Sequence, residues 1–121
     1  MAQVFFVDDD PITLRILGKA AQLLGHQPVL LETGQAVLDQ ASQQKPDLIM
    51  MDMMMPDMGG LDVLAHLRAD PALAKIPVVI LSAGAALDDG DRAKAAGAQE
   101  YIAKPVSLNI LLATIKRYTG G

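Results

Sequence analysis

Five short apolar runs divide this chain into repeating units, and a segment with helical periodicity follows each run. The runs are continuously apolar rather than alternating in polarity, which is typical of strands that are covered on both faces of a sheet. Because a helix-length crossover separates successive strands, the pattern predicts an α/β fold with a parallel sheet and helices on both faces. The runs cover residues 4–7, 29–31, 48–51, 78–81 and 101–103.

Start signals for helices lie between the runs. Asp10 is expected to cap the first helix ahead of Pro11, and Ser107 is expected to cap the fifth. The fourth helical segment, residues 87–96, has the weakest pattern, because it combines alanines and acids with a glycine that costs a helix about 1 kcal/mol. The apolar stripes expected to face the core are Leu14, Leu17, Ala21 and Leu24; Val37, Leu38 and Ala41; Leu61, Leu64 and Leu67; and Leu108, Leu111, Leu112, Ile115 and Tyr118.

Length and composition exclude several classes of protein. The 121 residues suit one domain, which we expect to span residues 1–121 and to leave no room for an output domain after the fifth helix. The absence of cysteine excludes disulfides and thiolate metal sites and agrees with the reducing cytoplasm, where we expect the protein to act. A net charge of −4 lacks the basic footprint of a nucleic-acid binder, and the apolar runs are too short to span a membrane. Neither nucleic acid nor a membrane is therefore an expected partner.

Four of the five runs end in polar or charged residues. In an open α/β sheet, ligands bind outside the carboxyl ends of the strands, so these side chains are expected to gather at one edge. Carboxylates that converge there repel one another, and a lysine or a divalent cation must neutralise them. The residues concerned are Asp8, Asp9 and Asp10 after the first run, Asp52 after the third, Ser82 after the fourth and Lys104 after the fifth.

Mg²⁺ suits these residues, since it is a hard ion that takes one or two carboxylates and accepts phosphate oxygens. Asp9 and Asp8 are the candidate metal ligands, and Asp52 is the candidate nucleophile, because a carboxylate can attack a phosphoryl group and form an acyl phosphate. Lys104 is expected to pair with Asp52 at rest and with the phosphoryl group after transfer. The hydroxyl of Ser82 can then donate a hydrogen bond to the phosphoryl oxygens.

Four stretches of the sequence carry these residues: VDDDP at 7–11, DMMMPDMGGL at 52–61, LSA at 81–83 and YIAKP at 101–105. In this order and spacing they resemble the receiver domain of bacterial two-component response regulators, close to the single-domain chemotaxis type. Each stretch alone is a weak signal, but together they extend over essentially the whole chain. The resemblance implies a flavodoxin-like (βα)5 fold with the strand order 2-1-3-4-5.

The resemblance also implies the ligands of a Mg²⁺ ion, for which Mn²⁺ is expected to substitute. Asp9 and Asp52 would bind the ion directly, together with the backbone carbonyl of Met54, and Asp8 would act partly through water. Asp52 would receive its phosphoryl group from a phosphohistidine of a sensor histidine kinase or a histidine phosphotransfer protein. Such a domain catalyses only its own phosphorylation and dephosphorylation, so we do not expect an enzyme.

Phosphorylation would shift such a domain between two states. Ser82 would swing inward to meet the phosphoryl group, and Tyr101 would change rotamer with it. The Lys104–Pro105 peptide bond would be cis, which is otherwise the minority form before proline. The face made by the segment 87–96, the fifth strand and the fifth helix would then change its affinity for a downstream protein that the sequence does not identify.

Four positions depart from the commonest pattern of these domains. Ser82 stands where threonine is frequent, which keeps the hydroxyl, and Gly59 stands where an acid or asparagine is common. Met54 and Gly84, two residues after Asp52 and Ser82, are expected to tune how long the phosphoryl group lasts.

Some residues have simpler explanations. Asp10 is best explained as a helix-capping acid. The methionines between residues 50 and 55 are interpreted as adaptable core filling plus a loop. Tyr101 could equally be a half-buried edge residue, and His26 and His66 are expected to be solvated.

Three other functions are alternatives. A phosphatase with an aspartyl nucleophile would usually carry a second aspartate two residues after Asp52, where this chain has Met54. A receiver-like interaction module that is not regulated by phosphorylation would typically lack one of the acids, the hydroxyl or the lysine. A flavin-binding domain would need a phosphate-cradling loop after the first run, and the acids at 8–10 would repel a flavin phosphate.

Overall fold

The computed structural model describes residues 1–83 and 89–120, and it contains a five-stranded sheet in which all neighbouring strands are parallel. The strand order is β2-β1-β3-β4-β5, which confirms the fold class and the order expected from the sequence. The strands are β1 (Gln3–Val7), β2 (Gln27–Leu31), β3 (Leu48–Asp52), β4 (Val78–Ser82) and β5 (Glu100–Ala103), and the helices are α1 (Pro11–Leu23), α2 (Gly34–Gln44), α3 (Gly60–Ala69), α4 (Asp89–Ala95) and α5 (Leu108–Thr119).

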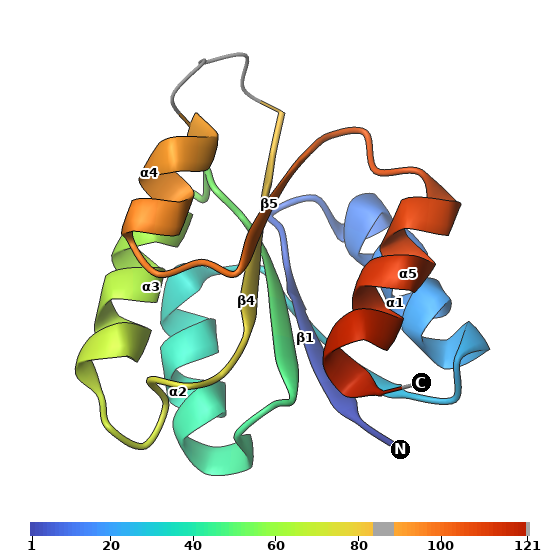
Figure 1. Cartoon of the computed structure of the whole chain (residues 1–121), viewed down its shortest axis with the longest axis horizontal. Helices are drawn as coiled ribbons and strands as arrows, with labels where there is room; N and C mark the ends of the chain where they lie inside the picture. The colour runs from blue at the N-terminus through green and yellow to red at the C-terminus, as the bar shows by residue number, and fades with distance from the viewer. Residues whose placement is uncertain (84–88, 121) are drawn as a thin grey trace.

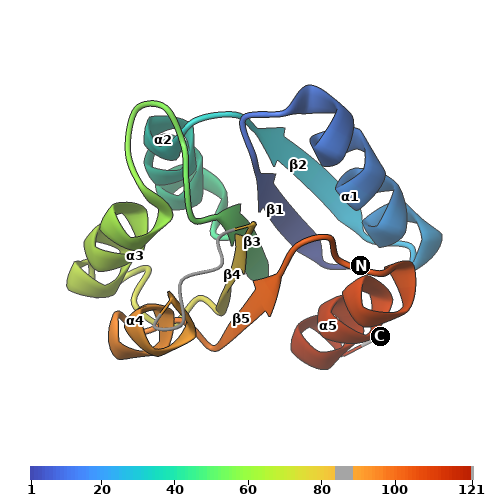
Figure 2. The same cartoon turned by 90° about the horizontal axis from the view of Figure 1, so that it is seen from above.

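The helices form two layers, one on each face of the sheet (Figure 1). α1 and α5 cover one face, whereas α2, α3 and α4 cover the other, as Figure 2 also shows. The central strands β3 and β4 are buried at every position. β2 and β5 form the edges, where Leu30 is 40% exposed. The prediction that all five strands are covered on both faces is therefore wrong for the two edges, because the helix layers cover the centre of the sheet more fully.

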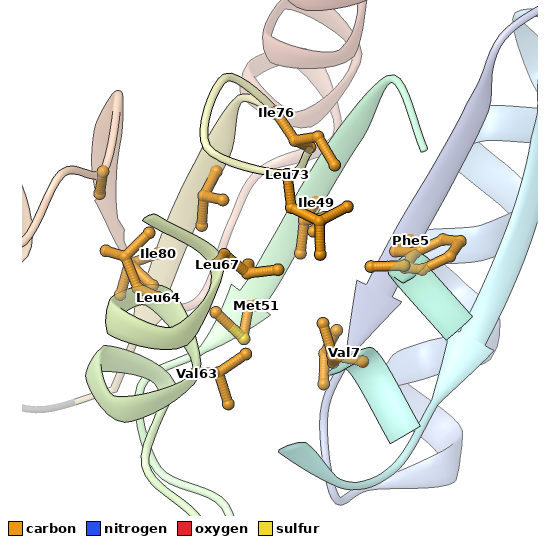
Figure 3. Packing of buried hydrophobic residues seen from close by; sticks show 14 of the residues in the cluster. Phe5, Val7, Ile49, Met51, Val63, Leu64, Leu67, Leu73, Ile76 and Ile80 are labelled. Carbon is orange, nitrogen blue, oxygen red and sulfur yellow. The ribbon is translucent and has the colours of Figure 1, made fainter. Parts of the chain in front are cut away.

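Alternate residues of the inner strands supply two separate cores. Phe5, Val7 and Met51 contribute to one core, which also contains Val63 and Leu64 of α3 (Figure 3). The other core lies beneath α1 and α5 and includes Val4, Phe6, Met50, Leu14, Leu17, Leu111 and Ile115. Both faces of β1 and β3 are apolar for this reason, and their sequences do not alternate in polarity.

The run of methionines divides between core and loop, as the sequence predicted. Met50 and Met51 are fully buried in the two different cores, and Met53 is 7% exposed. Met54 is 74% exposed, so its side chain lies in solvent just after the end of β3.

Side-chain caps begin α1 and α5 as expected. Asp10 accepts a hydrogen bond from the amide of Ile12, and the hydroxyl of Ser107 accepts one from the amide of Ile110. The hydroxyl of Thr13 and the amide of Ile12 hold the pKa of Asp10 below its ordinary value. α4 begins at Asp89 in the structure; the predicted helical residues 87 and 88 lie outside the described residues.

Two predictions at the ends of elements need correction. Leu108 was predicted to face the core but is 53% exposed, because it is the first residue of α5, ahead of the turn that reaches the core. His26 was predicted to be solvated but is half-buried: its Nδ1 accepts the amide of Ala2 at 2.9 Å, and its Nε2 lies 3.2 Å from Oγ1 of Thr119. His26 thus links the beginning of the chain to the end of α5, whereas His66 is exposed as predicted.

Arg68 fastens the end of α3 to the loops that lead into β4 and β5. Its guanidinium donates hydrogen bonds to the backbone oxygens of Gly97, Ala74 and Ile76 over distances of 2.9 to 3.1 Å. Burial lowers the pKa of Arg68. The two bonds to Gly97 hold the chain just after the end of α4.

We expect Gly60→Ala to lower the free energy of unfolding by about 1–3 kcal/mol, as overpacked sites do. A Cβ at Gly60 would lie 2.5 Å from the carbonyl oxygen of Asp52, a backbone atom that cannot move aside easily. Urea unfolding measures the change. Gly59→Ser is the control, because a Cβ at Gly59 has its nearest neighbour at 3.5 Å and serine is a favoured N-cap. Equal losses in the two variants would contradict the prediction.

Candidate functional site

Three carboxylates meet where β1 and β3 end. Asp8 and Asp9 follow β1, and Asp52 is the last residue of β3. One oxygen from each of the three lies within 4.8 Å of the others. Asp8 and Asp52 are buried, with exposed fractions of 2% and 8%, whereas Asp9 is exposed. The structure therefore brings together the three acids that the strand ends predicted, at the edge that faces the viewer in Figure 2.

Lys104 bridges the two buried acids. Its Nζ donates hydrogen bonds to Oδ2 of Asp8 at 2.6 Å and to Oδ2 of Asp52 at 3.1 Å. Burial alone would lower the pKa of Lys104, but the bonds to Asp8 and Asp52 outweigh burial and hold the pKa above its ordinary value. The predicted pair of Lys104 with Asp52 is present, and the shorter contact to Asp8 was not predicted. The Lys104–Pro105 bond is cis, as the resemblance implied.

Backbone amides fix the other oxygen of each buried acid. Oδ1 of Asp8 accepts the amide of Asp10 at 2.9 Å, and Oδ1 of Asp52 accepts the amide of Met54 at 3.3 Å. Each carboxylate is thus held between a backbone donor and the ammonium of Lys104. This arrangement orients the oxygens before any ligand binds.

The donor atoms of this cluster fit Mg²⁺. Three carboxylates and one ammonium leave a formal charge of −2, which a divalent cation would neutralise. All the donors are oxygens, as a hard cation prefers. The residues that would hold the ion are Asp8, Asp9 and Asp52, and the backbone of Met54 adjoins them through its bond to Asp52.

Ser82 lies at the end of β4 and is 2% exposed. Its hydroxyl donates a long hydrogen bond, 3.5 Å, to Oδ2 of Asp89 at the start of α4. Asp89 is itself only 5% exposed, and its other oxygen lies 3.6 Å from the guanidinium of Arg92. The sequence did not single out Asp89, since an acid in the first turn of a helix is usually explained by the helix dipole alone.

Tyr101 is half-buried on β5 and packs against the core beneath α3 and α4. A Cβ added to Gly90 would lie 3.3 Å from Cδ2 of Tyr101, so the ring lies against the first turn of α4. Ser82 and Tyr101 therefore both contact the same end of α4. Gly84, predicted to influence the phosphoryl lifetime, lies outside the described residues.

Comparisons with known proteins show to which family this chain belongs. A family model described as the response regulator receiver domain matches residues 4–116. The polar-differentiation response regulator DivK of Brucella anthropi is 33% identical over 117 residues, which are 97% of this chain and 95% of the relative. The structure of the chemotaxis response regulator CheY4 of Vibrio cholerae matches with a TM-score of 0.90 and 26% identity, covering 98% of both chains.

The receiver domain of the sensor histidine kinase PA1611 of Pseudomonas aeruginosa matches with a TM-score of 0.89 and 26% identity, covering 99% of this chain and 98% of that one. That structure has a magnesium ion coordinated in its active-site cleft. From the family match and the relatives, this chain belongs to the response regulator receiver domains of two-component systems. The resemblance drawn from the four sequence stretches is confirmed.

We expect Lys104→Met to destabilise the domain by about 1–3 kcal/mol when Mg²⁺ is removed with EDTA, because two buried carboxylates lose a charged hydrogen-bond partner. Saturating Mg²⁺ should stabilise the Lys104→Met variant and offset most of the stability lost in EDTA, since the ion binds the folded state. Urea unfolding with and without Mg²⁺ measures both effects. Lys75→Met, at an exposed lysine, is the control. A Lys104 variant as stable as the wild type in EDTA would contradict the expectation.

Proposed function

We propose that this receiver domain is a phosphorylation-dependent switch in which Asp52 accepts a phosphoryl group from a phosphohistidine of a sensor histidine kinase or a histidine phosphotransfer protein. One observation carries the proposal: the buried carboxylate of Asp52 is held by Lys104 and by the amide of Met54, beside the carboxylates of Asp8 and Asp9. The combination supplies a nucleophile, a neutralising cation and ligands for a metal.

The transfer follows from these contacts. A carboxylate oxygen of Asp52 attacks the phosphorus, the nitrogen–phosphorus bond of the donor breaks, and the donor imidazole leaves. Lys104, which already contacts Asp52, pairs with the new phosphoryl oxygens. Mg²⁺ or Mn²⁺, held by Asp8, Asp9, Asp52 and the carbonyl of Met54, would offset negative charge on the transferring group.

The switch acts through Ser82 and α4. A phosphoryl group brings close to two negative charges to the site and offers strong acceptor oxygens. The hydroxyl of Ser82, which donates to Asp89 in this structure, turns to the phosphoryl group instead. Tyr101 follows by changing rotamer, since its ring contacts the same turn of α4. The surface of α4, β5 and α5 then changes its affinity for a downstream protein.

The donor protein docks beside α1. Ile12 and Ile16 of α1 are 61% and 62% exposed. Next to them lies a mainly apolar pocket of about 430 Å³, whose lining includes Ile16, Lys104, Pro105 and Val106. A partner that covers this surface lies next to Lys104, the residue that contacts Asp52.

The alternatives have less support. A phosphatase would need a general acid two residues after Asp52, and Met54 there offers an exposed thioether. An interaction module without phosphorylation would not need the acids, Ser82 and Lys104 together. Within the described residues, no helix is long and apolar enough to cross a membrane. In the proposed function the domain acts in the cytoplasm, without nucleic acid or membrane as partner and without turnover of another substrate.

We expect a single phosphoryl adduct when the protein is incubated with Mg²⁺ and a small acyl phosphate donor, read as intact mass. Asp52→Asn should abolish the adduct, because the amide is a poor nucleophile, and hydroxylamine should remove it from the wild type, as it does acyl phosphates. Asp62→Asn, an exposed acid on α3, is the control for the loss of one negative charge. If a small donor gives no adduct, beryllofluoride is added and the amide spectra of the protein are recorded. No adduct together with unchanged amide spectra would reject the proposal.

We expect Ser82→Ala to accept the phosphoryl group on Asp52 but to lose most of the response in α4. Alanine has no hydroxyl that could leave Asp89 and donate to the phosphoryl oxygens, so phosphorylation cannot pull this position away from α4. Hydrogen exchange of the amides in Asp89–Ala95, with and without beryllofluoride, measures the response. Ser42→Ala, at an exposed serine on α2, should respond like the wild type. A full α4 response in Ser82→Ala would show that the signal takes another route.

A further inference from the structure

The loop between β3 and α3 is fastened to the beginning of α2 by Asp57. Oδ1 of Asp57 accepts the amide of Gly34 at 2.9 Å, and Oδ2 accepts the amide of Gln35 at 3.0 Å. Thr33, the N-cap of α2, accepts the next amide, that of Ala36, at 3.1 Å. Two of the first three amides of α2 are therefore capped by a side chain from a different part of the chain.

The contact is a favourable one electrostatically. A carboxylate at a helix N-terminus meets the positive end of the helix dipole, and its hydrogen bonds are charge-assisted. The amides of Gly34 and Gln35 accordingly hold the pKa of Asp57 below its ordinary value. Close packing brings the amides within reach: a Cβ at Gly34 would lie 2.8 Å from Cγ2 of Val63, so α2 could not come this near to α3 with a larger residue.

The fastened loop is the one that carries Met54. Its start is tied to β4, since the amide of Met53 donates to the oxygen of Leu81 at 2.9 Å. Its end is tied back to its start, since the amide of Gly60 donates to the oxygen of Met53 at 2.8 Å. Between these two points Asp57 joins the loop to α2 by hydrogen bonds, and Met58 packs against Gly34 of α2. Figure 2 shows the loop passing beside α2.

α2 is connected in turn to the other side of the acid cluster. The amide of Asp8 donates to the oxygen of Leu31, the last residue of β2, at 3.1 Å, and the chain enters α2 three residues later at Gly34. A path of contacts therefore runs from Asp8 through β2 and α2 to Asp57, and through the loop to Met54. β1 and β3, which position the three acids, also pair directly in the sheet; in this path Asp57 is the residue that joins the loop carrying Met54 to α2.

We infer that Asp57 is a positioning residue for the metal site, which sets the backbone of Met54 relative to Asp8, Asp9 and Asp52. The inference rests on the proposed function, because it concerns the same site. Asp57 itself contacts neither the acids nor Lys104 in the described bonds; it acts through the loop. Without Asp57 the carboxylates stay in place, but the loop is no longer hydrogen-bonded to α2. Affinity for the ion therefore falls by more than the loss of folding stability explains.

The test compares the Mg²⁺ affinity of the wild type, Asp57→Ala, Asp57→Asn and Thr33→Ala by isothermal titration calorimetry. We expect the dissociation constant to rise about tenfold in Asp57→Ala, the usual effect of losing a residue that orients metal ligands. Asp57→Asn keeps an oxygen acceptor and should fall between the wild type and Asp57→Ala. Thr33→Ala removes a cap from the same helix without touching the loop, so it should lower the melting temperature but leave Mg²⁺ affinity unchanged.

The outcomes separate this inference from the function on which it rests. A wild type that bound no Mg²⁺ would overturn both. A wild type that binds normally, with Asp57→Ala within about twofold of it, would overturn the inference alone. So would an equal loss of affinity in Thr33→Ala, because the effect would then come from α2 rather than from the loop. Thermal melts confirm that each variant is folded, and Asp57→Asn decides the question if Asp57→Ala does not fold.

Discussion

Lys104 holds together two buried carboxylates that would otherwise repel each other, and the site depends on this contact. Asp8 follows β1 and Asp52 ends the neighbouring strand β3, and both are removed from water. Each is oriented by a backbone amide on one oxygen and by the shared ammonium on the other. The remaining negative charge, enlarged by Asp9, is not neutralised within the cluster, so the resting site favours a divalent cation. The fold therefore holds an arrangement of charges that a divalent cation would complete.

The parallel sheet explains how residues so far apart in sequence reach one place. Carboxyl ends of parallel strands lie on the same edge, so Asp52, Ser82 and Lys104 lie at one edge of the sheet although long helical crossovers separate them. The two apolar cores hold the strands from both faces and fix their register. The inner strands β1, β3 and β4 are packed on both faces, so the positions of the polar residues at their ends are fixed. The connecting loops can contribute ligands.

The strand-end residues could be predicted because their position depends on local pattern and on one general rule of parallel sheets. Other contacts could not be predicted, since they depend on how separate elements approach each other. Asp57 lies in a turn, and nothing near it in the sequence indicates that α2 is its partner. Asp89 resembles an ordinary helix-start acid until Ser82 is seen beside it. The position of His26 likewise depends on the end of α5, and the exposure of Leu30 depends on which strand lies at the edge.

Among the described residues, different kinds of contact lie at the two ends of α4, and the proposed switch depends on this difference. After its last turn, Gly97 accepts two hydrogen bonds from Arg68, which is itself anchored to two further backbone oxygens. At its first turn, Asp89 receives a long bond from Ser82, a hydroxyl that can exchange one acceptor for another by rotation. In the proposed switch, a negative charge added at Asp52 competes for the hydroxyl of Ser82 and does not contact Arg68. The first turn of α4 is then the part that we propose a phosphoryl group displaces, with the far end as the pivot.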